Sequence, residues 1–325
     1  MRTARSLAVV LPVVGALLAG CGLQSASTFT PQAAPGAIQP IAGVDGAQVT
    51  VGSKNFTEQL ILGKIAVIAL QVAGFSVADR TNIPGAAPSR AGQLSGEIDM
   101  QWEYTGTGWL NYLAMPEGIP DQQEQYEAVR DADAANGISW LPPAEANNTY
   151  AFAVRSEARA DLGNVTSLSD VAALPVDERT FCVESEFATR SDGFEPMLEA
   201  YGIPLGSPQG VPRENVRVLD TGAVYTATDG GDCNFGEVFT TDGRIESLDL
   251  TVLEDDRGYF PAYNIAPVVR TDTLDEHPEI ADVFAQITPL LTDEVMIGLN
   301  GRVDVQGEEP ADVAYAWMKS VGLVS

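Results

Sequence analysis

A strand-to-helix turn near residue 54 combines a cation with unpaired backbone N–H groups. A β-rich run at 49–51 leads into a glycine and a serine, and apolar residues then recur at helical spacing from 60 to 72. Such a turn leaves the positive end of the helix dipole at a sheet edge, which favours an anionic ligand group, and Lys54 adds a full charge there. Asn55 is expected to cap the helix, with Glu58 closing a capping box. The stretch predicts a carboxylate-binding point, although an ordinary turn with a surface lysine fits it equally.

Tyrosines stand at strand ends and chain crossings. Tyr104 follows a strand-like run, Tyr150 begins another, Tyr225 lies in a helix-like segment, and Tyr263 lies at an expected return of the chain, with Tyr259 as its alternative. Taken singly, each fits a half-buried core or rim position. Electron-rich ring faces together attract a cation that cannot donate hydrogen bonds, and a quaternary ammonium is such a cation. The set therefore predicts an aromatic box for a quaternary amine.

Two lobes are expected to position these residues. Short β runs alternate with amphipathic helical patterns, which is typical of α/β lobes built on parallel strands. The chain has 325 residues, enough for two lobes of ordinary size. We expect a first lobe from 48–152 plus 264–325 and an inserted second lobe from 153–263. Two strands that connect the lobes would then act as a hinge.

The N-terminus indicates where the protein works. Arg2 and Arg5 precede an apolar run at 7–18 that is too short to span a bilayer. It ends in Leu-Ala-Gly-Cys, which resembles a bacterial lipobox, so residues 1–20 are predicted to be a signal peptide and Cys21 to carry the lipid. An ordinary signal peptide with a chance cysteine is the alternative. The lipid would hold the protein at the outer face of the bacterial cytoplasmic membrane, in the periplasm or at the cell surface, with no other membrane contact.

Residues 21–47 have the composition of a linker. They are mainly small and polar residues with proline, and Asp45 is their only charge. Such a segment buries too little apolar surface to offset its conformational entropy. We therefore predict a flexible linker between the anchor and the folded part.

Charge and cysteine usage exclude several classes of protein. The net charge of −27 argues against nucleic acid and anionic membrane surfaces as partners. Cys182 and Cys233 would lie in an oxidising compartment, and neither has a metal-binding spacing, so a structural disulfide is the leading interpretation. His277 is the only histidine, and the chain has no nucleophile elbow or phosphate loop. The sequence thus predicts a protein that is not an enzyme and needs no cofactor or metal.

Five motifs resemble one known family in order and approximate spacing. They are Gly-Ser-Lys-Asn-Phe-Thr-Glu-Gln (52–59), Glu-Tyr-Thr-Gly-Thr-Gly (103–108), Asn-Asn-Thr-Tyr-Ala (147–151), Thr-Asp-Gly-Arg-Ile (241–245) and Leu-Glu-Asp-Asp-x-x-x-Phe-Pro-x-Tyr (253–263). The family is the substrate-binding lipoproteins of osmoprotectant ABC importers, of the glycine betaine, carnitine and choline type. The resemblance implies a type II periplasmic-binding-protein fold, a monomer that captures a small ligand in the cleft between its lobes. It also implies delivery of that ligand to a membrane permease.

The same resemblance implies a binding site with two ends. Tyrosines of the box would hold the ammonium group, two cations and a threonine would hold a carboxylate, and a glutamine would make a looser, choline-type contact. The implied ligand-binding residues are Lys54, Gln59, Tyr104, Thr107, Asn148, Tyr150, Arg190, Tyr225 and Tyr263. A site drawing on both lobes is complete only when they close, so ligand would favour the closed state.

Departures from the family pattern leave the ligand open. Gln101 and Trp102 stand where many relatives have a tyrosine or proline, and a proline-rich turn at 84–88 replaces the usual glycine-rich one. Choline, carnitine or an uncharged aromatic or phenolic ligand on the same fold therefore remain alternatives. A lipid-anchored adhesion or signalling protein would carry the same N-terminus but would not need these cations and tyrosines.

Overall fold

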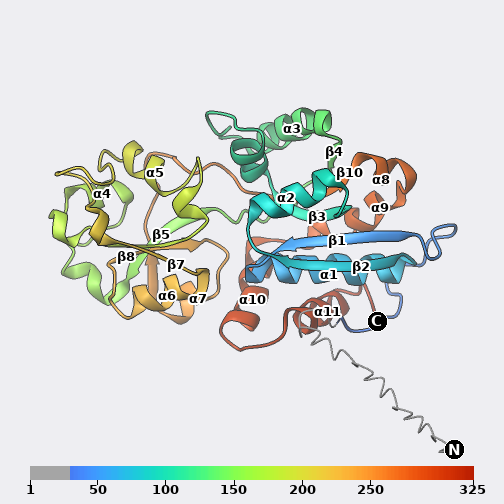
Figure 1. Ribbon diagram of the computed structural model, residues 1–325. Coiled ribbons are helices and arrows are strands. Elements are labelled where there is room, and N and C mark those ends of the chain that lie inside the picture. Colours follow the sequence, from blue (N-terminus) through green and yellow to red (C-terminus); the bar gives the residue numbers. More distant parts are fainter. Residues whose placement is uncertain (1–29) are drawn as a thin grey trace, which may run out of the picture.

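Two five-stranded sheets, each covered by helices, form two lobes that lie side by side in the computed structural model (Figure 1). The structure describes residues 30–325, so the predicted signal peptide and Cys21 lie outside the described residues. The predicted two-lobed α/β architecture is confirmed. Among residues 30–325, no helix is long and apolar enough to cross a bilayer.

The first lobe is built on a sheet of order β2-β1-β3-β10-β4. Its strands are β1 (Gln48–Lys54), β2 (Ser76–Ile83), β3 (Met100–Tyr104), β4 (Ile138–Trp140) and β10 (Ile265–Arg270). β1 runs parallel to β2 and β3, whereas β10 runs antiparallel to β3 and β4. Because β1 and β3 are parallel neighbours, Lys54 and Tyr104 lie at the same edge of this sheet.

The second lobe repeats this arrangement with the order β7-β6-β8-β5-β9. Its strands are β5 (Tyr150–Arg155), β6 (Phe181–Glu184), β7 (Val216–Leu219), β8 (Phe235–Phe239) and β9 (Leu250–Val252). β6 runs parallel to β7 and β8, and β5 runs antiparallel to β8 and β9. In each sheet one strand runs antiparallel to both of its neighbours: β10 in the first sheet and β5 in the second.

Helices cover both sheets. Those of the first lobe are α1 (Thr57–Ala73), α2 (Ala86–Ser95), α3 (Gln122–Asp133), α8 (Thr271–Glu276), α9 (Glu279–Ala285), α10 (Asp293–Asp304) and α11 (Pro310–Ser320). Those of the second are α4 (Leu168–Ala173), α5 (Phe194–Ala200), α6 (Thr221–Asp229) and α7 (Arg244–Ser247). α1 is buried along most of its length because it packs between the first sheet and α9, α10 and α11.

The chain crosses between the lobes twice, from β4 to β5 and from β9 to β10. The two crossing segments meet where Asn147 and Asn264 form an isolated antiparallel bridge. All of β5, from Tyr150 onward, pairs in the second sheet, and β10 pairs in the first. The residue numbers at which one lobe gives way to the other stay a prediction.

The segment before β1 does not behave as a loose linker where the structure describes it. Ala37 and Ile38 donate backbone hydrogen bonds to the carbonyls of Gly322 and Leu323, and Pro35 bridges to Val324. Ile38 is fully buried in the core of the first lobe, and Val44 is almost fully buried there. The prediction of a flexible linker over 21–47 is therefore corrected for this part, because isolated apolar side chains in a polar segment find a place in the core.

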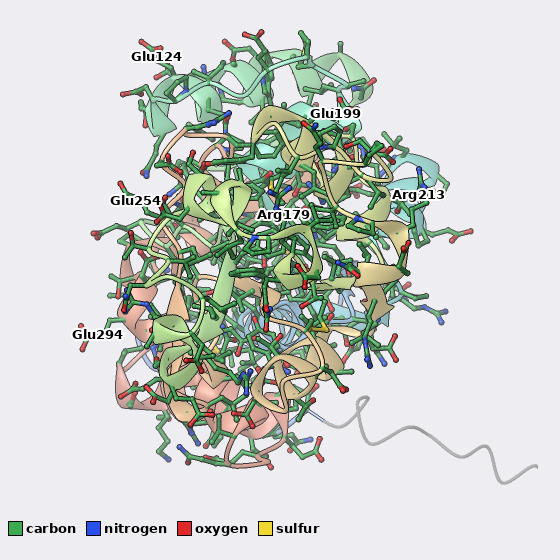
Figure 2. All side chains as sticks on the ribbon, turned by 90° about the vertical axis from the view of Figure 1, so that its left-hand side faces the viewer. Glu124, Arg179, Glu199, Arg213, Glu254 and Glu294 are labelled. Atoms are coloured by element: carbon green, nitrogen blue, oxygen red, sulfur yellow. A yellow bond between two sulfur atoms is a disulfide. The ribbon has the colours of Figure 1, made fainter. Side chains whose placement is uncertain are left out.

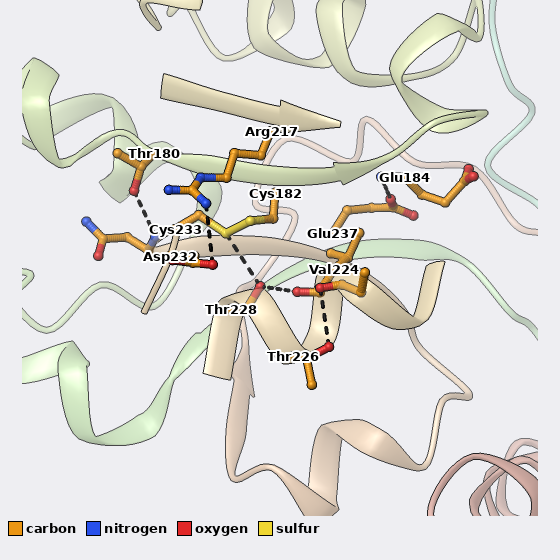
Figure 3. The surroundings of a disulfide bond; sticks show 12 residues. Thr180, Cys182, Glu184, Arg217, Val224, Thr226, Thr228, Asp232, Cys233 and Glu237 are labelled. Carbon is orange, nitrogen blue, oxygen red and sulfur yellow. Dashed lines mark hydrogen bonds and ion pairs between the residues drawn. A yellow bond between two sulfur atoms is a disulfide. The ribbon is translucent and has the colours of Figure 1, made fainter. Parts of the chain in front are cut away.

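A disulfide joins Cys182 in β6 to Cys233 just before β8, with the Cα atoms 5.8 Å apart (Figure 3). β6 and β8 are parallel neighbours, which brings the two cysteines together although they are 51 positions apart in the sequence. Both are buried, and Thr228 of α6 lies against Cys233. The bond closes a long loop inside the second lobe and lies within that lobe's core.

Exposed carboxylates spread the negative charge over both lobes. Glu124 and Glu294 belong to the first lobe and Glu199 to the second, and Figure 2 shows Glu124, Glu254 and Glu294 at the outline of the molecule. Exposed charges more than about 10 Å apart are largely screened at ordinary ionic strength. The acidity therefore bears on solubility more than on the fold.

Candidate functional site

A cavity of about 420 Å³ lies between the lobes. Its wall includes Lys54, Tyr104 and Thr107 from the first lobe and Arg190 and Phe239 from the second. This volume falls in the range of small-molecule sites. A ligand bound here would touch both lobes at once.

Five aromatic rings gather at this cavity and form what we call the aromatic cluster: Phe56, Tyr104, Tyr150, Phe239 and Tyr263. Phe56, at the start of α1, stacks on Phe239, at the end of β8, with ring centroids 5.2 Å apart. This contact crosses from one lobe to the other. Tyr150 lies 5.4 Å from both Phe239 and Tyr263, and Phe56 lies 6.1 Å from Tyr104. The cluster offers several ring faces to one small volume.

The protein's own cations cover three of these rings. The Lys54 ammonium lies 4.7 Å from the centre of the Tyr104 ring and 5.9 Å from that of Phe56. The Arg190 guanidinium lies 5.2 Å from the centre of the Tyr150 ring. These are cation–π distances, so these ring faces are placed where they can stabilise positive charge.

Each of these two cations is also paired with a buried carboxylate. Lys54 Nζ donates to Glu103, whose other oxygen accepts the hydroxyl of Tyr112. Arg190 donates to both oxygens of Asp192. Burial alone raises the pKa of Asp192, but the charge and hydrogen bonds of Arg190 outweigh it and hold that pKa below its ordinary value. The cationic end of the site is thus neutralised from within.

Glu58 occupies a place that sequence reasoning missed. The helix begins at Thr57 with Phe56 as its cap residue and no side-chain cap, so the prediction of a capping box from Asn55 and Glu58 is wrong. Glu58 is instead buried, and its carboxylate accepts four hydrogen bonds from side chains of both lobes. Burial raises the pKa of Glu58, and those hydrogen bonds oppose the rise.

The residues expected to bind ligand separate into two groups. Lys54, Tyr104, Thr107, Asn148, Tyr150, Arg190 and Tyr263 line the cavity. Gln59 and Tyr225 do not: Gln59 is fully buried, and its side-chain oxygen accepts from the Lys54 backbone N–H. Tyr225 packs in the second lobe, where α6 covers β8, and its hydroxyl accepts from the Phe239 N–H. Each of them accepts a hydrogen bond from the backbone of a residue that lines the cavity.

Tyr259, the alternative fourth tyrosine, lies elsewhere. It lines a separate pocket with Asp192, whereas Tyr263 faces the cavity. Among residues 30–325, no group of three or more His, Cys, Asp or Glu is placed to hold a metal ion.

Two phenylalanines that line the cavity lie in or next to the family motifs. Phe56 stands in the first of the five motifs, and Phe239 comes two residues before the fourth. Their position in or next to these motifs is a signal in the sequence, but a search for tyrosine rings alone does not use it. Glu103 stands in the second motif beside Tyr104, and nothing in the local sequence shows that it faces Lys54.

Comparison with known proteins identifies the family and the fold. The model of the family described as the substrate-binding domain of ABC-type glycine betaine transport systems matches residues 47–320. The chain belongs to this family. Its members bind a small molecule outside the cytoplasm and pass it to the permease of an ABC importer, so this protein is a substrate-binding component with a permease partner. Its relatives are transport proteins and not enzymes.

Individual relatives extend the match. The chain is 40% identical over 287 residues to a glycine-betaine-binding protein of Pseudomonas aeruginosa, covering 86% of this chain and 89% of that protein. It resembles the solved structure of apo YehZ from Escherichia coli with a TM-score of 0.62 and 29% identity, over 86% of this chain and all of the other. A solved glycine betaine/carnitine/choline ABC transporter protein gives a TM-score of 0.67 at 24% identity, over 84% of this chain and 98% of the other, which shows the fold.

Proposed function

We propose that the protein captures a quaternary-ammonium osmolyte such as glycine betaine in the interlobe cavity and delivers it to its permease. The aromatic cluster beside two cations carries this proposal. A methylated ammonium cannot donate hydrogen bonds, so it gains most from ring faces, and these faces already hold the cations of Lys54 and Arg190. The relative from Pseudomonas aeruginosa, a glycine-betaine-binding protein, supports the same ligand class.

The two ends of a betaine match different parts of the wall. Its ammonium would lie against the rings of Tyr104, Tyr150 and Phe239, in competition with the cations that cover Tyr104 and Tyr150. Its carboxylate would approach Lys54 and Arg190, near the hydroxyl of Thr107, which is 3.4 Å from Arg190 Nη2. Groups from both lobes then hold one ligand, which favours closure.

Choline is the second candidate, and one observation favours it. Lys54 and Arg190 each have a carboxylate partner of their own, Glu103 and Asp192. Choline has no carboxylate and leaves both pairs intact, whereas a betaine must share the cations with them. Carnitine and an uncharged aromatic or phenolic ligand are the further alternatives on the same fold.

Lipid anchoring through Cys21 belongs to the same proposal. The protein would act as a monomer at the outer face of the bacterial cytoplasmic membrane, held there by the lipid alone. It would carry out no catalysis and need no cofactor. Replacement of Cys21 by serine should release the protein from the membrane fraction, and retention there would contradict the anchor.

Calorimetry with a panel of ligands tests the proposal. Glycine betaine, proline betaine, carnitine and choline should include at least one that binds with one site per chain, and ectoine serves as a comparison without a quaternary ammonium. Binding only by an uncharged aromatic compound would contradict the proposal that the ligand is a quaternary amine. Family membership would stand in that case.

A further inference from the structure

One buried carboxylate is shared by the aromatic cluster and the second lobe. Glu58 Oε1 accepts the hydroxyl of Tyr104 at 2.8 Å, and Tyr104 is a member of the cluster. Glu58 Oε2 accepts the hydroxyl of Thr241 at 2.6 Å, and Thr241 belongs to the loop between β8 and α7 of the second lobe. The Glu58 side chain is 2% exposed, so few other partners can reach it.

The side-chain amides of Asn148 and Asn300 donate to Glu58, and this orientation costs free energy. Asn148 Nδ2 donates to Oε1 at 2.8 Å, and Asn300 Nδ2 donates to Oε2 at 3.0 Å. The carbonyl oxygens of both amides are buried without a hydrogen-bond partner among residues 30–325. An unpaired buried oxygen costs free energy, so the four donors around Glu58 are arranged for a charged acceptor.

The loop that carries Thr241 fits closely against the first lobe. The Thr241 carbonyl accepts from Asn300 Nδ2 of α10 at 2.9 Å. A Cβ on Gly243 would lie 2.6 Å from the Cα of Gly301, so only glycine allows this approach. Arg244 also lies 3.5 Å from Asp304 at the end of α10. All of these contacts exist only while the lobes are together.

We propose that Glu58 is a positioning residue that couples closure of the lobes to the aromatic cluster. Closure adds the Thr241 hydroxyl to the carboxylate that already holds Tyr104. Opening removes that donor and lets water reach the carboxylate, which loosens the hold on the Tyr104 ring. The inference rests on the proposed function, since it concerns the cavity that takes the osmolyte.

Replacement of Thr241 by valine removes the hydroxyl and keeps the shape of the side chain. A hydrogen bond to a charged group contributes enough to closure that affinity for glycine betaine should fall roughly tenfold to a hundredfold. The radius of gyration of the ligand-free variant, measured by small-angle X-ray scattering, should exceed that of the parent. Thr288→Val is the matched control, because Thr288 is also buried but its hydroxyl donates within its own segment to the Phe284 carbonyl.

A double-variant comparison tests the coupling itself. Tyr104→Phe removes the other hydroxyl from the same carboxylate and keeps the ring. If Glu58 joins the two, the loss of affinity in Tyr104→Phe/Thr241→Val should differ from the product of the single losses by roughly threefold or more. Equality with that product would overturn the coupling, because independent structural roles multiply.

The outcomes separate this inference from the proposed function. Failure of the parent protein to bind any quaternary amine removes the proposed function, while the ligand-free scattering profiles still decide whether Thr241 holds the lobes together. Binding by the parent with Thr241→Val indistinguishable from Thr288→Val in affinity and in radius of gyration overturns the inference alone. A loss confined to Thr241→Val supports it.

Discussion

Arg190 grips Asp192 with two parallel hydrogen bonds, from Nε to Oδ1 at 2.7 Å and from Nη2 to Oδ2 at 2.6 Å. This is the bidentate arrangement by which arginine recognises a carboxylate. Tyr263 donates its hydroxyl to the same Oδ2, and Asn111 of the first lobe donates to Oδ1. A ligand carboxylate that approaches Arg190 must therefore compete with a well-held internal one.

The first prediction concerns this competition. Asp192→Asn removes the internal charge and frees the guanidinium for a ligand carboxylate. The ratio of affinities for glycine betaine and choline should rise roughly tenfold or more in favour of glycine betaine, because the repulsion between two carboxylates disappears. Calorimetry with both ligands measures the ratio, which does not depend on the stability of the variant.

A matched control exists elsewhere in the chain. Arg270 and Asp272 form the same Arg-x-Asp pair on the surface of the first lobe. Asp272→Asn should leave the ratio of affinities unchanged. An unchanged ratio in Asp192→Asn as well would show that the ligand does not use Arg190.

Sequence reasoning found both cations but neither of their partners. Lys54 carries a local signal, the start of a helix, and Arg190 is implied by the family resemblance. Glu103 lies 49 residues from Lys54 and reaches it because β1 and β3 are neighbours in the sheet. Strand order is a long-range property, so a single sequence gives the residue types at strand ends without saying which of them face each other.

The second prediction concerns the pair of Lys54 and Glu103, which is almost fully buried. Lys54→Met leaves an uncompensated charge in the interior and should lower the free energy of unfolding by about 3–5 kcal/mol. The double variant Lys54→Met/Glu103→Gln removes both charges and should recover much of that loss. Urea unfolding measures both values. The exposed Lys319, changed to methionine, should stay within about 0.5 kcal/mol of the parent.

The elements themselves were largely predictable, and their ends were not. Hydrophobic periodicity predicts the β-rich run at 49–51, which lies within β1, and the helical run at 60–72, which lies within α1. The start of α1 differs from the expected capping by Asn55. Tertiary contacts bury Glu58, so it does not close a capping box, and Phe56 takes the cap position. β4 has three residues and was not expected, since so short a run has no readable period.

The third prediction separates ring from hydroxyl in the aromatic cluster. Among residues 30–325 the Tyr150 hydroxyl has no hydrogen-bond partner, while the ring faces Arg190. Tyr150→Phe should therefore cost little affinity for a quaternary amine, and Tyr150→Leu should cost about 1–2 kcal/mol because it removes the ring quadrupole. Calorimetry showing equal losses would contradict a cation–π role for Tyr150.

Tyr225 should show the opposite behaviour. Its hydroxyl accepts the Phe239 N–H inside the second lobe, and the residue does not line the cavity. Tyr225→Phe leaves a buried N–H unpaired and should lower the free energy of unfolding by about 1–3 kcal/mol. The comparison with Tyr150→Phe in the same urea titration separates a structural tyrosine from a ligand-facing one.

The last prediction concerns pH and Glu237 of β8, a fully buried carboxyl behind the cavity wall. Burial raises the pKa of Glu237 from 4.5 to about 8, although the Glu184 N–H that it accepts opposes the rise. Between these two pH values the folded protein keeps a proton that the unfolded chain has lost. This contribution to stability is therefore lost as the pH rises through that window, by roughly 1.4 kcal/mol per pH unit.

Glu237→Gln stays neutral at every pH and still offers an oxygen to the Glu184 N–H. Its free energy of unfolding should be close to that of the parent near the lower end of the window, and should exceed it progressively toward pH 8. Urea unfolding of both proteins across this range measures the difference, in which the titration of all other groups cancels. Glu254→Gln, at an exposed site, should show no such trend. A difference that stays constant with pH would mean that Glu237 is ionised in the folded protein, and would require a cation close to its carboxylate.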